Sequence, residues 1–120
     1  MNSASEITVR IESANNQRVL RVAGPVDLAN AAALRQALVD VLADSDAGCS
    51  AIVDLAAATA VDFSGMQLLC SAHRSFRERG SAMSLRDVPD WLRQAAAAAG
   101  FTMPTLACRY RQGDDCLWRD

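Results

Sequence analysis

The chain has 120 residues, of which 51% are hydrophobic and 22% charged, and its formal net charge is −2. Its length is typical of one domain with its own core, since domains usually contain about 100 to 150 residues. No basic stretch could follow a phosphate backbone, which excludes nucleic acid as an expected partner. No apolar run approaches the roughly 20 residues that span a bilayer, and residues 1–6 lack the pattern of a signal peptide. We expect a single cytoplasmic domain over residues 1–120, disordered at 1–5.

The cysteines have no spacing typical of a metal or redox motif. They are Cys49, Cys70, Cys108 and Cys116, and His73 is the only histidine. A zinc site needs a cluster of such ligands, and a cytoplasmic protein keeps its thiols reduced. We therefore expect free thiols, no metal and no cofactor. A disulfide or metal site between Cys108 and Cys116, which flank a predicted turn, is the alternative.

The first third of the chain predicts a hairpin followed by a helix. Residues 7–12 alternate apolar and polar side chains, as a half-buried strand does, and residues 19–22 form a second strand after the turn signal at Asn15 and Asn16. Gly24 and Pro25 end that strand, and Asp27 is the predicted N-cap of a helix. Apolar residues then recur with helical spacing: Leu34, Leu38, Val41 and Leu42.

A buried strand leading into a polar turn dominates the middle of the chain. Residues 51–55 form a short apolar run, 56–60 a connector of small residues, and a helix follows at 64–79. Between them lies the sequence Val-Asp-Phe-Ser-Gly. Ser64 and Gln67 fit a capping box, in which Ser64 is the N-cap. The start of a helix also favours anions, including a phosphorylated side chain, because its N–H groups are unpaired.

The last third predicts a strand at 83–86, a helix beginning near Pro89 and ending before Gly100, and a short strand within 101–110. Trp118 is expected to plug the sheet edge, with an interaction role as the alternative. The full order is β-β-α-β-α-β-α-β. It predicts an α/β fold, with a mixed sheet of four to five strands and helices packed mainly on one face.

The turn at residues 62–65 and this order of elements resemble the STAS domain. That family comprises anti-sigma factor antagonists and the cytoplasmic domains of sulfate transporters. Its members carry a turn of the form Asp-Ser-Ser-Gly or Asp-Thr-Ala-Gly after a buried strand. In the antagonists the residue directly after the aspartate is the phosphoacceptor. Here that position is Phe63, and the hydroxyl lies one residue later, at Ser64.

The resemblance implies a non-enzymatic, bacterial regulatory module that docks an ATP-binding, kinase-like anti-sigma factor. A subunit of a lipid-transport ABC system and an adaptor in a chemotaxis or two-component cluster are the alternatives. Ser64 is either a displaced phosphoacceptor or only a helix cap. No catalytic set is visible, because His73 has no partner cluster in the sequence. The expected partner-binding residues are Asp27, Asp62, Phe63, Ser64, Gly65 and Met66.

Overall fold

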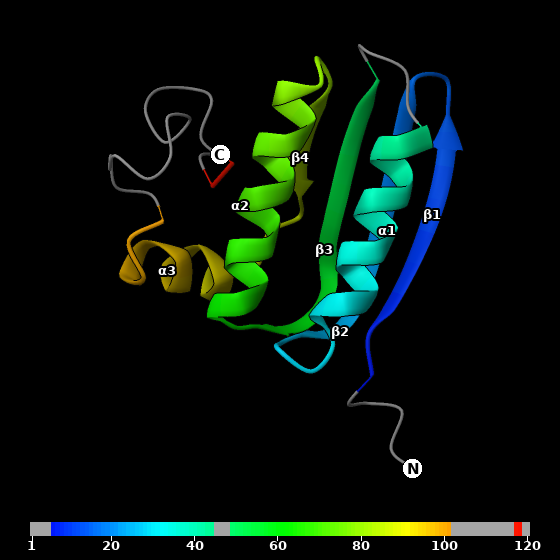
Figure 1. Ribbon diagram of the computed structural model, residues 1–120. Helices are drawn as coiled ribbons and strands as arrows, with labels where there is room; N and C mark the ends of the chain where they lie inside the picture. Colours follow the sequence, from blue (N-terminus) through cyan, green and yellow to red (C-terminus); the bar gives the residue numbers. More distant parts are fainter. Residues whose placement is uncertain (1–5, 45–48, 102–116, 119–120) are drawn as a thin grey trace.

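The structure of the protein is a computed structural model that describes residues 6–44, 49–101 and 117–118. These residues form a four-stranded sheet with the order β1-β2-β3-β4 (Figure 1). Strand β1 (Thr8–Ala14) pairs antiparallel with β2 (Gln17–Val26), while β3 (Ser50–Val61) and β4 (Ala82–Arg86) continue the sheet in parallel. The predicted hairpin and the mixed α/β sheet are therefore confirmed.

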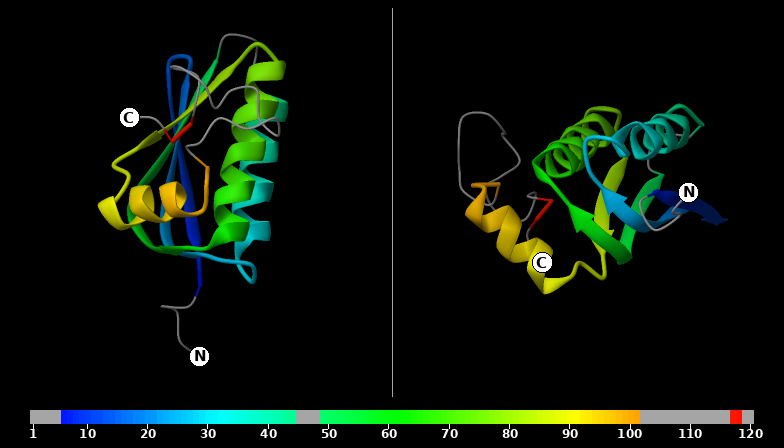
Figure 2. Two further views of the ribbon diagram at one scale, coloured as in Figure 1. Left: turned by 90° about the vertical axis from the view of Figure 1, so that its left-hand side faces the viewer. Right: turned by 90° about the horizontal axis from the view of Figure 1, so that it is seen from below.

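Two helices cover one face of this sheet. Helix α1 (Ala31–Asp44) follows β2 and helix α2 (Phe63–Glu78) follows β3, and Figure 2 shows both on the same side of the strands. Helix α3 (Asp90–Ala98) lies at the β4 side of the molecule (Figures 1 and 2). The core fills the space between sheet and helices, and its largest fully buried side chains are Phe76, Leu20, Leu34, Leu55, Leu69, Leu92, Val22, Val26 and Val53.

Both central strands are longer than predicted. Strand β2 continues through Gly24 and Pro25, and β3 continues past Leu55 to Val61, because the two strands stay paired after register shifts. At Gly24 the backbone has φ +94°, and a Cβ there would lie 2.5 Å from the carbonyl oxygen of Glu6, so only glycine fits. The small residues 56–60 of β3 were predicted to be a connector because they lack the bulky apolar side chains that indicate a strand.

A row of charged side chains crosses the face of the sheet opposite Leu20 and Val53. Arg21, Asp54 and Arg86 occupy one register position on β2, β3 and β4. Asp54 is 5% exposed, and its carboxylate accepts hydrogen bonds from Arg21 Nη1 at 3.0 Å and Arg86 Nη2 at 2.8 Å. Burial alone would raise the pKa of Asp54, but the Ala56 N–H bond and the two guanidinium groups outweigh it and lower that pKa.

Some of the remaining predictions from the sequence are confirmed, and others concern residues outside the described ranges. The ends of α2 and α3 lie close to their predicted bounds, and Gly100 follows α3 with φ +88°, as expected of the residue after a helix. The predicted strand at 101–110, apart from Phe101, lies outside the described residues, as do Cys108 and Cys116. None of the described helices is long and apolar enough to cross a membrane.

Candidate functional site

Two turns meet where β2 and β3 end. The strands are parallel, so their carboxyl ends reach the same edge of the sheet, and α1 and α2 both begin there. This edge is the lower end of the molecule in Figure 1. The Asp62 backbone N–H donates to the carbonyl of Val26 at 3.1 Å, which joins the start of one turn to the start of the other.

The Asp62 side chain fastens both turns together. Its Oδ1 accepts a hydrogen bond from the Gly65 N–H at 2.9 Å, so Asp62 is the N-cap of α2. Its Oδ2 accepts from the Leu28 N–H of the other turn at 3.0 Å. The capping-box prediction is therefore wrong, because Ser64 lies inside the first turn of α2 and is not its N-cap.

Asp27 also closes a turn, but it does not cap α1. Its Oδ1 accepts hydrogen bonds from the backbone N–H and from Nδ2 of Asn30, both at 3.0 Å. Helix α1 begins only at Ala31. The N-cap prediction for Asp27 failed because an aspartate can satisfy the backbone of a turn just as well as that of a helix.

Gly65 and Met66 hold the helix on the sheet instead of facing solvent. A Cβ on Gly65 would lie 2.5 Å from the Val26 carbonyl oxygen and 2.9 Å from a methyl of Val61. Glycine is therefore required for α2 to approach β2 this closely. Met66 is 5% exposed and belongs to the core, so little of its side chain is available to the partner that it was expected to bind.

Exposed apolar side chains flank the bonded turns. Phe63 is 53% exposed, and Leu28, which the sequence analysis missed, is 78% exposed. The only sequence signal for Leu28 is a large apolar residue inside a polar turn. Ser64 is partly exposed, and its hydroxyl makes no hydrogen bond within the described part of the chain. We call the group Asp27, Leu28, Asp62, Phe63 and Ser64 the paired-turn surface.

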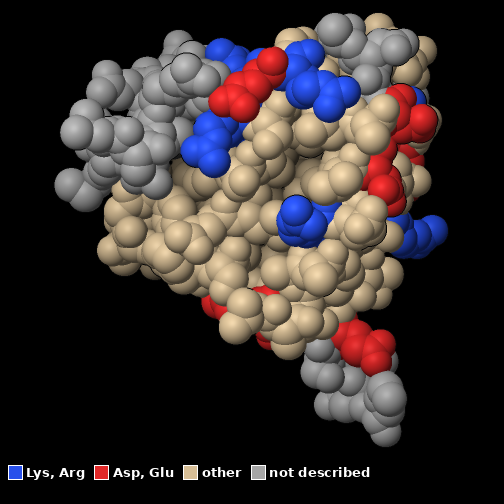
Figure 3. All heavy atoms as spheres, in the orientation of Figure 1, with Lys and Arg blue, Asp and Glu red and all other residues tan. Residues whose placement is uncertain are grey.

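The paired-turn surface carries little charge beyond its two aspartates, and Phe63 packs against a neighbouring ring. In Figure 3 the lower end of the molecule is largely free of charged side chains apart from small acidic areas, whereas basic side chains gather at the opposite end. The Phe63 ring packs against Phe101, with ring centroids 5.3 Å apart. Apolar side chains around a small polar centre are typical of protein-docking patches.

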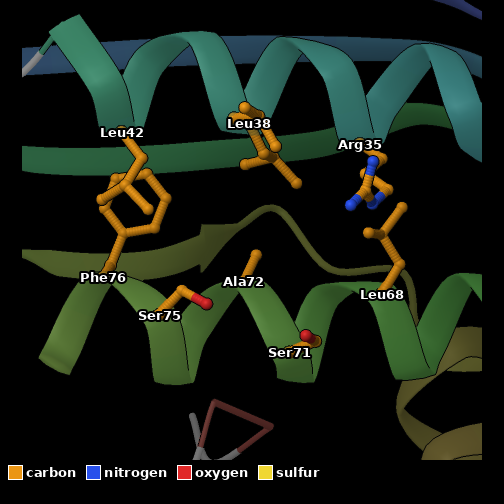
Figure 4. A pocket seen from close by; sticks show the side chains of 9 residues that line it. Arg35, Leu38, Leu42, Leu68, Ser71, Ala72, Ser75 and Phe76 are labelled. Carbon is orange, nitrogen blue, oxygen red and sulfur yellow. The ribbon is translucent and has the colours of Figure 1, made fainter.

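A shallow groove lies between α1 and α2. It holds about 130 Å³, less than the ~300 Å³ at which ligand pockets usually begin. Side chains from both helices point toward one another across it (Figure 4). The groove therefore suits one or two partner side chains better than a cofactor. Its lining residues are Arg35, Leu38, Val39, Leu42, Leu68, Ser71, Ala72, Ser75 and Phe76.

The sequence analysis also considered His73, two of the cysteines and Trp118. His73 is buried on α2, and no group of three potential metal ligands occurs among the described residues. Within the described residues, Cys49 and Cys70 are not joined in a disulfide. Trp118 is buried, and two of its contacts are with Cys70 of α2 and with Phe101. Its Nε1 donates to the sulfur of Cys70 at 3.0 Å, and its ring centroid lies 6.1 Å from that of Phe101.

A family model and a solved structure both relate this chain to the same family of proteins. The family model described as "Mlab, STAS domain" matches residues 9–106. An anti-sigma factor antagonist from Mycobacterium paratuberculosis is 26% identical, with a TM-score of 0.65 over 84% of this chain and 88% of that one. No curated protein matched the chain.

More distant structures share the fold. The unphosphorylated anti-sigma factor antagonist SpoIIAA is 17% identical, with a TM-score of 0.64 over 78% of this chain and 81% of that one. The murine anion transporter Solute Carrier 26 family member A9 is 15% identical, with a TM-score of 0.67 over 80% of this chain and 16% of that one.

Proposed function

The chain belongs to the STAS domain family, and from that premise we propose that it is a non-enzymatic regulatory module that binds a protein partner through the paired-turn surface. It resembles anti-sigma factor antagonists. The proposed partner is therefore an ATP-binding, kinase-like anti-sigma factor. Asp27, Asp62 and Gly65 shape the surface, while Leu28, Phe63 and Ser64 contact the partner.

One observation carries this proposal: Leu28 and Phe63 are exposed at 78% and 53% next to a turn that hydrogen bonds hold in place. Large apolar side chains in water are unfavourable, and burying one in an interface contributes about 1.5–3 kcal/mol. Because Asp62 fixes the backbone beneath them, little conformational entropy is lost when a partner covers them. The surface is thus suited to repeated, specific docking.

Ser64 is a poor substitute for the usual phosphoacceptor. Phe63 and Ser64 are consecutive residues of α2, so their side chains project about 100° apart around the helix axis. A kinase aligned with the position of Phe63 would therefore miss the hydroxyl. The hydroxyl itself is not occupied by capping, and a phosphate there would lie at the positive end of α2. We propose that phosphorylation is weak or absent and that binding is constitutive or controlled elsewhere.

Titration calorimetry against kinase-like, ATP-binding anti-sigma factors from the same genome tests the docking surface. We expect Leu28→Asp and Phe63→Asp to weaken binding at least tenfold. Val39→Asp is the matched control, because Val39 is an exposed apolar residue of α1 that lines the groove between α1 and α2. If only Val39→Asp weakens binding, the partner docks on that groove and the paired-turn surface is rejected.

Intact-mass measurement after incubation with the partner and ATP tests the switch. We expect no more than a minor fraction of the chain to gain a phosphoryl group. Near-complete addition of one phosphoryl group that disappears in Ser64→Ala would contradict constitutive binding. It would instead restore an ordinary switch with a displaced acceptor.

The second candidate is a permanent subunit of a transport assembly, such as a lipid-transport ABC system. The observation that favours it is Phe63 itself, since a stable complex needs no phosphoacceptor at that position. In this case the same surface would bind a nucleotide-binding subunit. Co-purification of the chain with such a subunit, lost in Phe63→Asp and insensitive to ATP, would favour this candidate over the first.

A further inference from the structure

Strand β1 presents a free edge. Among the described residues it pairs only with β2, so its other side has unpaired backbone groups (Figure 1). Ala14 and Gln17 are partners on either side of the two-residue turn. In such a hairpin the flanking partners exchange backbone hydrogen bonds, so hydrogen-bonded pairs alternate along the ladder from this position. The same alternation accounts for Asn16, whose carbonyl accepts from Ser50 of β3 at 2.9 Å.

This alternation decides which residues of β1 can bond to another strand. Arg10 and Glu12 direct their backbone groups toward β2. The N–H and C=O groups of Val9, Ile11 and Ser13 therefore point outward, away from the sheet. Ile11 is also 46% exposed, although it lies on the face that the helices cover. An edge with outward backbone groups and an exposed apolar side chain is a template for another strand.

We propose that the occupant of this edge is a second copy of the chain, paired antiparallel about a two-fold axis through Ile11. In that register Ile11 faces Ile11 of the second copy, and their N–H and C=O groups bond reciprocally. Arg10 faces Glu12 of the second copy, and Glu12 faces its Arg10. These two are non-hydrogen-bonded pairs, whose Cα atoms are only about 4.5 Å apart, so the opposite charges lie close together.

Charge selects this register over its neighbours. A shift that keeps the backbone bonds would place the axis at Arg10 or at Glu12. Arg10 would then face its own copy, or Glu12 would, and like charges directly opposite one another are destabilising. Only the axis at Ile11 places each charge opposite an opposite charge of the second copy. Glu12 already pairs with Arg21 of its own chain at 3.1 Å and gains Arg10 of the second copy as a further partner. The contact is small compared with standard interfaces of about 1,600 Å², so the dimer forms and dissociates with concentration.

Sedimentation velocity from micromolar to near-millimolar concentration tests the dimer. We expect the wild-type chain to shift from monomer to dimer, and Arg10→Glu and Glu12→Arg each to remain monomeric. Mixing the two variants in equal amounts should restore the dimer, because one variant is then acidic at both positions and the other is basic at both. A monomeric wild type, dimeric single variants, or a mixture that stays monomeric would each overturn the proposal.

Amide hydrogen exchange on the wild-type chain is an independent test, because it needs no variant to fold. We expect the amides of Val9, Ile11 and Ser13 to exchange several-fold more slowly as the protein concentration rises. The amides of Arg10 and Glu12 already bond to β2, so their rates should not change. Equal exchange of the outward amides at low and high concentration would exclude pairing through this edge.

Discussion

Replacing Asp62 by alanine should loosen the paired-turn surface by a predictable amount. The change removes the acceptors of the Gly65 and Leu28 N–H groups. Loss of an N-cap typically costs about 1 kcal/mol, and a further hydrogen bond about 0.5–1.5 kcal/mol. Because Asp62 is exposed, water partly replaces it and the lower values apply. We expect a loss of about 1.5–2 kcal/mol, or roughly 6–8 °C in Tm for a domain of this size.

Urea unfolding followed by circular dichroism measures this loss, with a common m-value as the sign that the unfolded state is unchanged. Asp62→Asn keeps one acceptor oxygen and remains a good N-cap, so it should lose about half as much as alanine. Ser64→Ala, two residues further along the chain, is the matched control. The Ser64 hydroxyl makes no hydrogen bond within the described residues, so the stability of this variant should stay within about 0.5 kcal/mol of the wild type.

Two results would refute this reasoning. If Asp62→Ala is as stable as Ser64→Ala, the carboxylate does not hold the two turns together. If Asp62→Asn is as unstable as Asp62→Ala, the negative charge at the helix start matters and the acceptor geometry does not. In the first case the paired-turn surface would also lose its claim to be preorganised for a partner.

Further predictions concern the sheet and the core. Asp54→Asn should cost about 2 kcal/mol at neutral pH, because it breaks a buried ion pair with partly exposed arginines. The folded-state pKa of Asp54 is lowered, so its stabilisation is complete above the unfolded pKa of about 3.9 and is lost as the pH falls through the folded pKa. The wild type and Asp54→Asn should therefore converge in acid, and a constant difference would contradict this. Gly65→Ala should cost about 1–3 kcal/mol by overpacking against Val26, and a stabilised variant would refute the close approach. In thermal melts Trp118→Ala should cost about 3–5 kcal/mol and the exposed Trp91→Ala much less; equal losses would contradict the burial of Trp118.

Local pattern was enough to determine most elements of this protein. The apolar run at 51–55, the helical spacing of Leu34 and Leu38, and the stop at Gly100 all predict elements that the structure contains. These signals succeed because the period of buried side chains and the φ preference of glycine depend only on neighbouring residues. Together with the turn at 62–65, they were also sufficient to indicate the family.

Tertiary structure alone decided how the site is built. Several residues near the start of α2 are able to cap it, and Asp62 does so while also accepting the N–H of Leu28, a residue separated from it by 34 positions. Met66 is buried and Leu28 exposed because of where α1 and α2 lie on the sheet. The spacing of apolar residues along the sequence does not indicate where the helices lie on the sheet. It depends on how closely Gly65 lets α2 approach Val26, and such a distance exists only once both strands have paired.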